Sequence, residues 1–439
     1  DRILMKERSL KRSINGFQGI ALTISAVLGC GILVLPSLTA DTAGPASLLS
    51  WALMSVLAFP IVLTLANLAI RIPNAGGITA YVADAFGAHT SYLLSWIMLG
   101  SVPIGAPTLA LTGAIYCSNL LHLNHWAITG LAAGLLCVSL ILNSCGIKLS
   151  SRVSVVTVII IIGLIVIALA TQLRQVTPAA FHPFLTHGWL SVGSTTVLIF
   201  FSFVGWEMVT PLAEEFKNPK RDMMLSLLVG VCCISVLYLL LAFVTVGTHA
   251  YGGARTASLS LLLSSNFGPF GTAVVAVLAV FITFSAVHAN IAGFSRMVYA
   301  EARAGYFPAY FSVLHKKMQT PMHVLSMLGG VFFSLLFLYG VFHPSLSLLI
   351  KATSTVFIVS YVLTMLAALK LLRKPAHIRV SAWIACLTTL FIFLFSGWLI
   401  IYPLFLAVTG EVFHHFRAER AGQESATQVG DSERIKEWD

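Results

Sequence analysis

Long apolar runs separated by short polar segments make up nearly the whole chain. Twelve of these runs are close to or above the roughly 20 residues that a helix needs to cross a bilayer. They lie near residues 17–40, 46–70, 90–121, 125–145, 151–173, 190–213, 224–248, 269–300, 322–342, 345–370, 379–396 and 398–415. The pattern predicts an all-α integral membrane protein with twelve transmembrane helices.

Two of the runs contain residues that a simple spanning helix avoids. The first run contains Gly29-Cys30-Gly31, and the sixth contains Gly205 close to Glu207. Glycine costs about 1 kcal/mol relative to alanine inside a helix. Irregular backbone at membrane depth persists only where it is buried in protein or lines a cavity. The two sequences therefore predict broken helices.

Paired interruptions in two halves of a chain indicate a transporter binding site. Breaks in runs one and six imply two five-helix units, about 15–175 and 188–372, with two helices appended at about 379–415. An odd number of helices in each unit makes their orientations opposite, so the repeat is inverted. Residues 1–14 and 417–439 flank a transmembrane domain of residues 15–416.

A broken helix presents two kinds of backbone end at mid-membrane depth. The N-terminal end of a half-helix carries free N–H groups and partial positive charge, which suits a carboxylate. The opposite end carries free carbonyl groups, which suit an ammonium group. One zwitterionic amino acid would satisfy both ends at once. The alternative is that the glycines serve only close packing between helices.

Charge is scarce and unevenly distributed along the chain. Hydrophobic residues make up 58% and charged residues 10%, whereas soluble domains carry roughly 25% charged residues. In the predicted layout, 23 of the 26 Lys and Arg residues, Arg296 and Arg303 among them, lie on the side that holds both termini. The positive-inside rule then predicts a multi-pass cell-membrane protein with both termini cytoplasmic. The net charge of +10 follows from this topology, and nucleic-acid binding is not expected.

Several segments resemble, in order, those of the amino acid–polyamine–organocation (APC) superfamily. They are residues 29–36, 73–81, 203–207, 214–221 and 302–308. Residues 102–107 and 214–221 are most similar to the bacterial exporters of methionine and branched-chain amino acids. The resemblance implies a LeuT-type 5+5 inverted repeat that transports amino acids by alternating access, with no cofactor and no metal.

The resemblance also implies a set of substrate-binding residues. The segment that would hold the carboxylate comprises Val27, Gly29, Cys30, Gly31 and Ile32. The segment whose carbonyls would accept the ammonium comprises Phe201, Val204 and Gly205, with Phe201 as an aromatic gate. Asn290 matches a site-facing position, or else forms a hydrogen bond between helices without touching the ligand.

Ionisable residues inside the spans are candidates for coupling. Glu207 is an acid well inside a span, where an ionisable group suggests function. Relatives that carry it use it in proton-linked gating, and the alternative is that it stabilises the broken helix. His288 either relays protons or is a packing residue with satisfied hydrogen bonds. The fifth run lacks the central lysine that replaces a sodium ion in some proton-driven relatives, and the eighth lacks the adjacent Ser/Thr pair of a sodium site. Sodium dependence is therefore not expected, and proton coupling rests on Glu207 alone.

The expected lining is apolar and favours a neutral hydrophobic substrate; it comprises Val27, Ile32, Phe201, Phe203 and Val204. We expect export, or proton-linked antiport, of methionine, leucine, isoleucine and valine. A proton-coupled uptake permease or an exchanger of the same fold remains an alternative. An intramembrane enzyme is a remote one, because the sequence contains neither an HExxH metal motif nor an identifiable nucleophile with its base.

Overall fold

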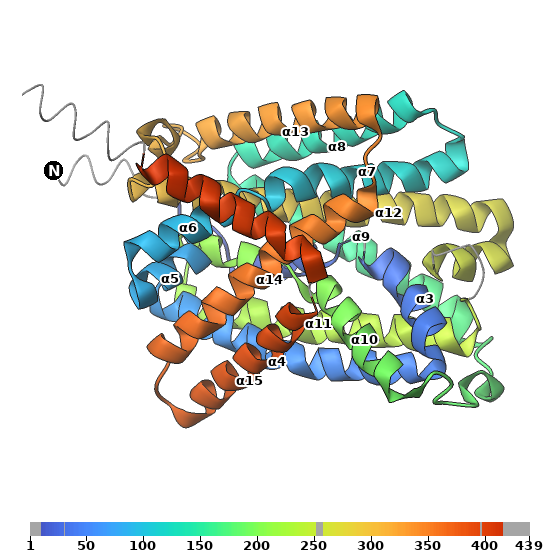
Figure 1. Ribbon diagram of the computed structural model, residues 1–439. Helices are drawn as coiled ribbons and strands as arrows, with labels where there is room; N and C mark the ends of the chain where they lie inside the picture. Colours follow the sequence, from blue (N-terminus) through green and yellow to red (C-terminus); the bar gives the residue numbers. More distant parts are fainter. Residues whose placement is uncertain (1–9, 30, 252–257, 396, 416–439) are drawn as a thin grey trace, which may run out of the picture.

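The computed structural model describes residues 10–29, 31–251, 258–395 and 397–415. In this part of the chain, every regular element is a helix, and the long helices form one bundle (Figure 1). The α-helices are α2 (Gly16–Val27), α3 (Gly31–Ala43), α4 (Ser47–Arg71), α5 (Ile78–Phe86), α6 (Ala88–Met98), α7 (Val102–Leu121), α8 (His125–Ser144), α9 (Ile147–Leu173), α10 (Gly188–Phe200), α11 (Pro219–Gly247), α12 (Ser258–Arg303), α13 (Met322–Phe342), α14 (Leu346–Leu371) and α15 (Ala376–Leu394).

Short 3₁₀ turns connect or extend several of these helices. They are η1 (Gly44–Ala46), η2 (Pro178–Phe181), η3 (Phe201–Phe203), η4 (Trp206–Met208), η5 (Thr210–Glu215), η6 (Ala309–Ser312) and η7 (Gly397–Ile400). A final apolar helical stretch, Gly397–His415, follows α15. Cys30 and the predicted tail 417–439 lie outside the described residues.

Eleven helical stretches among the described residues are long and apolar enough to cross a membrane. The number differs from the twelve predicted runs because of how the first run is built. It consists of α2 and α3, and α2 is only 12 residues long. The short turn η1 joins α3 to α4, so Gly31–Arg71 forms one continuous apolar stretch of 41 residues.

The third predicted run, residues 90–121, consists of two helices. A turn at Leu99–Ser101 separates α6 from α7, because Pro103 in the first turn of α7 has no N–H to donate to the preceding turn. α12 also departs from a straight helix. Gly268 has φ +53° and precedes Pro269, which kinks the helix there.

Backbone hydrogen bonds join the start of α2 to the end of η5. Ser13 N and Ile14 N donate to Glu215 O at 2.8 and 3.0 Å, and Lys217 N donates to Ile14 O at 2.9 Å. α2 itself begins with a capping box, in which Asn15 and Gln18 each accept a hydrogen bond from the other's backbone N–H. The ends of the first and sixth runs on this side of the bundle are thus tied together.

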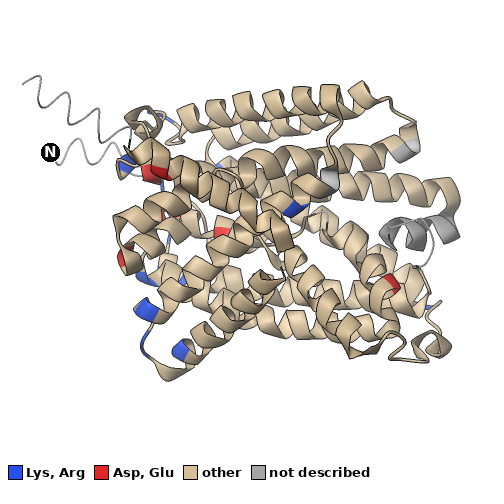
Figure 2. Ribbon diagram, viewed as in Figure 1, with Lys and Arg blue, Asp and Glu red and all other residues tan. Residues whose placement is uncertain are grey.

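The distribution of charge divides the bundle into two ends. Lys and Arg residues gather at the end of the bundle that carries the N-terminus (Figure 2). Many large apolar side chains on the outer helix faces are exposed, among them Phe337 and Leu394, as expected for faces that contact lipid.

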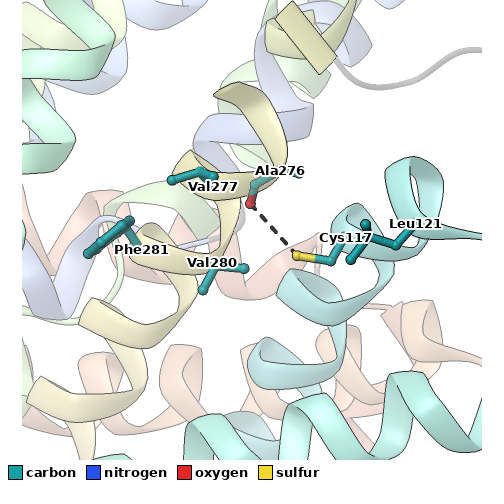
Figure 3. Close-up of a pocket in the computed structure, with 6 residues that line it drawn as sticks. All are labelled: Cys117, Leu121, Ala276, Val277, Val280 and Phe281. Carbon is teal, nitrogen blue, oxygen red and sulfur yellow. Dashed lines mark hydrogen bonds between the residues drawn. The ribbon is translucent and has the colours of Figure 1, made fainter. Parts of the chain in front are cut away.

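A shallow pocket lies on the outside of this bundle between α7 and α12. It is lined by Cys117, Leu121, Ala276, Val277, Val280 and Phe281, with the Cys117 thiol 4.0 Å from Ala276 O (Figure 3). None of these side chains is charged. Such a lining is unsuited to a zwitterion, because it offers no partner for either charged group.

Candidate functional site

The first break separates α2 from α3. The backbone turns after Val27, where Gly29 N donates to Val27 O at 2.7 Å, and helical geometry resumes at Gly31. The last carbonyls of α2 and the first N–H groups of α3 are therefore released from the helical pattern at adjacent points. This is the pair of backbone ends that the glycine pattern predicts.

The second break follows α10 and η3. Val204 has extended backbone angles, and Gly205 has φ +131°, which glycine adopts far more readily than other residues. After this point the chain continues as the 3₁₀ turns η4 and η5 instead of the α-helix that the apolar run predicts. Pro211 contributes to this difference because it has no N–H for an α-helical bond.

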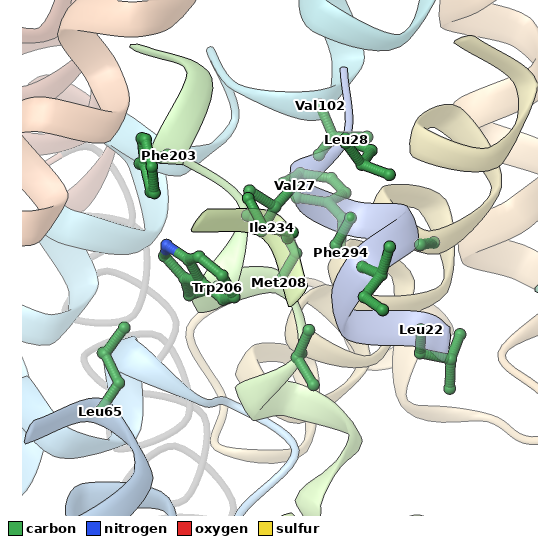
Figure 4. Close-up of a cluster of buried hydrophobic side chains, with 14 of the residues drawn as sticks. Leu22, Val27, Leu28, Leu65, Val102, Phe203, Trp206, Met208, Ile234 and Phe294 are labelled. Atoms are coloured by element: carbon green, nitrogen blue, oxygen red, sulfur yellow. The ribbon is translucent and has the colours of Figure 1, made fainter. Parts of the chain in front are cut away.

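The two breaks contact each other directly. A Cβ atom added at Gly205 would lie 2.4 Å from Ala26 O, and one added at Gly31 would lie 2.9 Å from Ser202 Cβ. Figure 4 shows side chains of both segments in one cluster, with Val27 from the first and Met208 from the second. The glycines thus allow a backbone crossing that any larger residue would obstruct.

The predicted substrate residues differ in their exposure. Val27, Ile32 and Gly205 are buried. The partly exposed ones are Gly29, Gly31, Phe201, Val204 and Asn290. Since a ligand can only reach an exposed surface, the second group holds the predicted residues that a ligand could touch.

Asn290 links α12 to the first break. Its amide nitrogen donates to Ala26 O at 3.2 Å and to Ala286 O at 2.7 Å. These bonds use both hydrogens of the amide group. Asn290 therefore satisfies a carbonyl freed by the break, as in the interhelical alternative, and only its amide oxygen is left to accept a hydrogen bond from a ligand.

Glu207 stabilises the second break from within. Its side chain is 1% exposed, and Oε2 accepts hydrogen bonds from Gly205 N at 3.0 Å and from the Tyr361 hydroxyl of α14. Oε1 has no hydrogen-bond partner among the described residues. The carboxyl thus connects the break to α14. The sequence does not point to Tyr361, because a tyrosine in an apolar helix carries no positional signal.

His288 belongs to a polar network that joins α12 to α8 and α9. Nε2 lies 3.1 Å from Ser150 O and 2.9 Å from Ser150 Oγ, and Nδ1 lies 3.1 Å from the Asn143 amide nitrogen. Both ring nitrogens have partners on α8 or α9. This geometry is that of a packing residue with satisfied hydrogen bonds.

Comparison with known proteins adds independent findings. A family model described as "Amino acid permease" matches residues 14–414. The chain is 51% identical over 405 residues to the uncharacterized amino acid permease YecA of Bacillus subtilis (strain 168), covering 91% of this chain and 95% of that protein.

Two more distant relatives carry more specific names. The L-methionine/branched-chain amino acid exporter YjeH of Escherichia coli (strain K12) is 28% identical over 403 residues, covering 90% of this chain and 94% of the exporter. The branched-chain amino acid permease BcaP of Bacillus subtilis (strain 168) is 25% identical over 424 residues, covering 90% of each chain.

Proposed function

This chain belongs to the amino acid permease family, and from that premise we propose that it moves amino acids across the cell membrane by alternating access. The family and the named relatives are transporters, not enzymes. The intramembrane-enzyme alternative is therefore set aside.

We propose that α2 and α3 form one broken span, which brings the total to twelve. The spans would then make a LeuT-type inverted repeat, with units at about 15–175 and 188–372 and appended helices at about 379–415. The interruptions after α2 and after η3 support this arrangement, because they fall in runs one and six. The basic residues at one end of the bundle support a cytoplasmic position for both termini (Figure 2).

The contact between the two breaks is the observation that carries the proposed site. The backbone at residues 27–32 would bind the substrate carboxylate at the start of α3. The carbonyls of residues 201–205 would accept the ammonium group, with the Phe201 ring closing over the ligand. A Cβ added at Gly205 would lie 2.4 Å from Ala26 O, and one added at Gly31 would lie 2.9 Å from Ser202 Cβ. This close approach of the two breaks supports binding of one small zwitterion by both.

We propose neutral hydrophobic amino acids, with methionine, leucine, isoleucine and valine as candidates. The partly exposed side chains at the breaks include Phe201 and Val204, which are apolar. The printed names of two relatives, a methionine/branched-chain exporter and a branched-chain permease, are consistent with this choice.

Proton-linked export is the proposed mode, with Glu207 as the coupling and gating residue. Its carboxyl connects the second break to α14, so a change in its protonation would alter a contact between two moving elements. The alternative is proton-coupled uptake or exchange by the same site. Imposing a pH gradient of either sign on vesicles of known orientation separates these modes.

Transport by the purified protein in proteoliposomes tests the function. We expect saturable counterflow of labelled methionine and leucine that unlabelled valine and isoleucine inhibit and arginine does not. The absence of saturable flux for every amino acid tested would reject the proposed function. Displacement of leucine by arginine would reject the neutral substrate.

A glycine substitution tests the site itself. Gly31→Val should abolish binding while the protein still inserts, because its Cβ would collide with Ser202. Gly163→Val is the matched control, since a Cβ at Gly163 meets no atom within 4 Å. Wild-type transport by Gly31→Val would contradict the proposed clamp.

A further inference from the structure

A buried carboxyl outside the proposed substrate site lies near the C-terminal end of α12. Glu301 is 3% exposed, although it precedes the end of the helix by only two residues. None of the described residues at the two helix breaks bonds to it. Its burial therefore calls for a separate explanation.

Glu301 joins three helices. Its Oε1 accepts a hydrogen bond from the Thr79 hydroxyl of α5, and its Oε2 accepts one from Ser95 Oγ of α6 at 2.5 Å. Ser91 Oγ, also on α6, donates to Thr79 O at 2.8 Å. The carboxyl thus holds the α5–α6 pair against α12.

No cation compensates Glu301 within the described part of the chain. The neighbouring acids of η5 are paired, with Glu215 2.7 Å from Arg296 and Glu214 2.6 Å from Arg303. The ion pairs found among the described residues do not include Glu301. A buried carboxylate without a cationic partner is costly.

The number of available hydrogens favours a neutral Glu301 side chain. The Thr79 hydroxyl also lies 2.9 Å from Gly76 O, and the Ser95 hydroxyl 2.8 Å from Ser91 O. Each hydroxyl has one hydrogen. If Glu301 is ionised, only these two hydrogens are available for the four contacts that the two hydroxyls make with carboxyl and backbone oxygens. A neutral acid adds a third hydrogen, because its own O–H can donate to one hydroxyl, which then donates to its carbonyl.

Other ionisable groups occur on the elements around Glu301. They are His288, Arg296, Tyr299 and Arg303 on α12, Glu214 and Glu215 on η5, Tyr81 and Asp84 on α5, His89 and Tyr92 on α6, Lys351, Tyr361 and Lys370 on α14, and Tyr306 beyond α12. Burial raises the pKa of the Tyr306 phenol. Tyr306 is therefore a neutral neighbour at ordinary pH.

The position of α5 makes this contact relevant to opening. A Cβ at Gly77, just before α5, would lie 2.6 Å from Thr210 Oγ1 of η5. At the other end of α5, Lys370 Nζ of α14 donates to Ala85 O at 2.6 Å. α5 is thus held between η5, which follows the second break, and α14, which contacts Glu207.

We propose that Glu301 is a positioning residue whose neutral carboxylic acid holds α5 and α6 against α12 and keeps this end of the bundle closed. Loss of its proton frees the α5–α6 pair. The consequence for transport rests on the proposed function, whereas the effect on α5 and α6 does not. An experiment can therefore reject the consequence for transport without rejecting the effect on α5 and α6.

Hydrogen exchange across α5 and α6, measured over a pH series on the full-length protein, tests the proposal. Glu301→Ala should speed exchange in both helices by about fivefold, the effect of losing one net hydrogen bond. Glu301→Gln should retain protection, because its amide can both donate and accept. If Glu301→Ala does not fold, Ser95→Ala takes its place and should also speed exchange.

The pH dependence separates this role from simple packing. Exchange in the wild type, divided by that of Glu301→Gln at each pH, should rise as the pH rises. Asp84→Asn, on the exposed side of α5, is the matched control and should follow the wild type. Exchange in Glu301→Gln as fast as in Glu301→Ala, or a constant ratio across the pH series, would overturn the proposal.

Transport assays on the same variants distinguish the two failures. Exchange that follows the expected pattern without flux of any amino acid would reject the proposed function alone. Normal flux with no effect of Glu301 on exchange would reject the positioning role alone.

Discussion

At the scale of single residues, the site depends on where a side chain is missing. Gly31 and Gly205 permit the contact between the breaks, and Gly293 of α12 permits a third close approach, where a Cβ would lie 1.9 Å from Met208 O. The sequence predicts the first two because they interrupt apolar runs. It could not indicate Gly293, whose partner lies 85 residues away along the chain.

Gly205→Ala should impair both stability and transport. The residue has φ +131°, and its Cβ would lie 2.4 Å from Ala26 O. Forcing a residue with a side chain into such a backbone region costs of order 1–3 kcal/mol. Thermal unfolding in detergent should show a lower midpoint than for Gly130→Ala, a control at an open position of α8. Equal midpoints for the two variants would contradict the close approach.

Tyr361→Phe should slow transport while leaving the fold intact. The change removes the hydroxyl that donates to Glu207 and keeps the ring that packs on Phe200. Losing a hydrogen bond to a carboxylate costs about 1.5–3 kcal/mol, so we expect roughly a tenfold or larger fall in the initial rate in proteoliposomes. Tyr339→Phe on α13 serves as the control. An unchanged transport rate for Tyr361→Phe would show that the hydrogen bond to Glu207 takes no part in gating.

At the scale of elements, the sequence predicts which helices form better than it predicts which helices touch. The apolar runs predict the long helices, and the glycines predict where two are interrupted. The 3₁₀ geometry of η5 was not predictable, because composition alone does not separate a 3₁₀ turn from one turn of α-helix. Arg296 is a further example. The sequence predicts its place near the basic end of the bundle but not its partner, because the structure buries it against Glu215, 81 residues away along the chain.

Breaking this buried ion pair should destabilise the protein more than removing it altogether. Arg296→Met leaves Glu215 buried without its cation, at a cost of about 3–5 kcal/mol. The double variant Arg296→Met/Glu215→Leu removes both charges and should recover most of that loss. Thermal melting followed by size-exclusion chromatography measures both. A double variant no more stable than the single one would contradict this expectation.

At the scale of the whole molecule, basic residues mark one end of the bundle (Figure 2). The sequence predicts this asymmetry because it depends only on the order of runs and charges. How the helices pack against one another depends on shape, and no linear pattern encodes it. The contact of α11 with α2, for example, requires Gly230 to face Thr23, where a Cβ would lie 2.5 Å from its Cγ2.

Protease protection of a C-terminal tag tests the proposed orientation. The tag should be protected in right-side-out vesicles and removed in inside-out vesicles, because the basic end is expected to face the cytoplasm. A tag at the N-terminus should behave in the same way. Opposite behaviour of the two tags would indicate an odd number of spans.

The backbone bonds between residues 13–14 and 215–217 have a kinetic consequence. Because these bonds tie the start of α2 to the end of η5, the two segments move together. α2 therefore cannot tilt outward unless η5 moves with it. The signals of fluorescent probes attached separately to α2 and η5 should therefore change with one common rate constant after a jump in substrate concentration. Two distinct rate constants would mean that the hydrogen bonds between the segments break first.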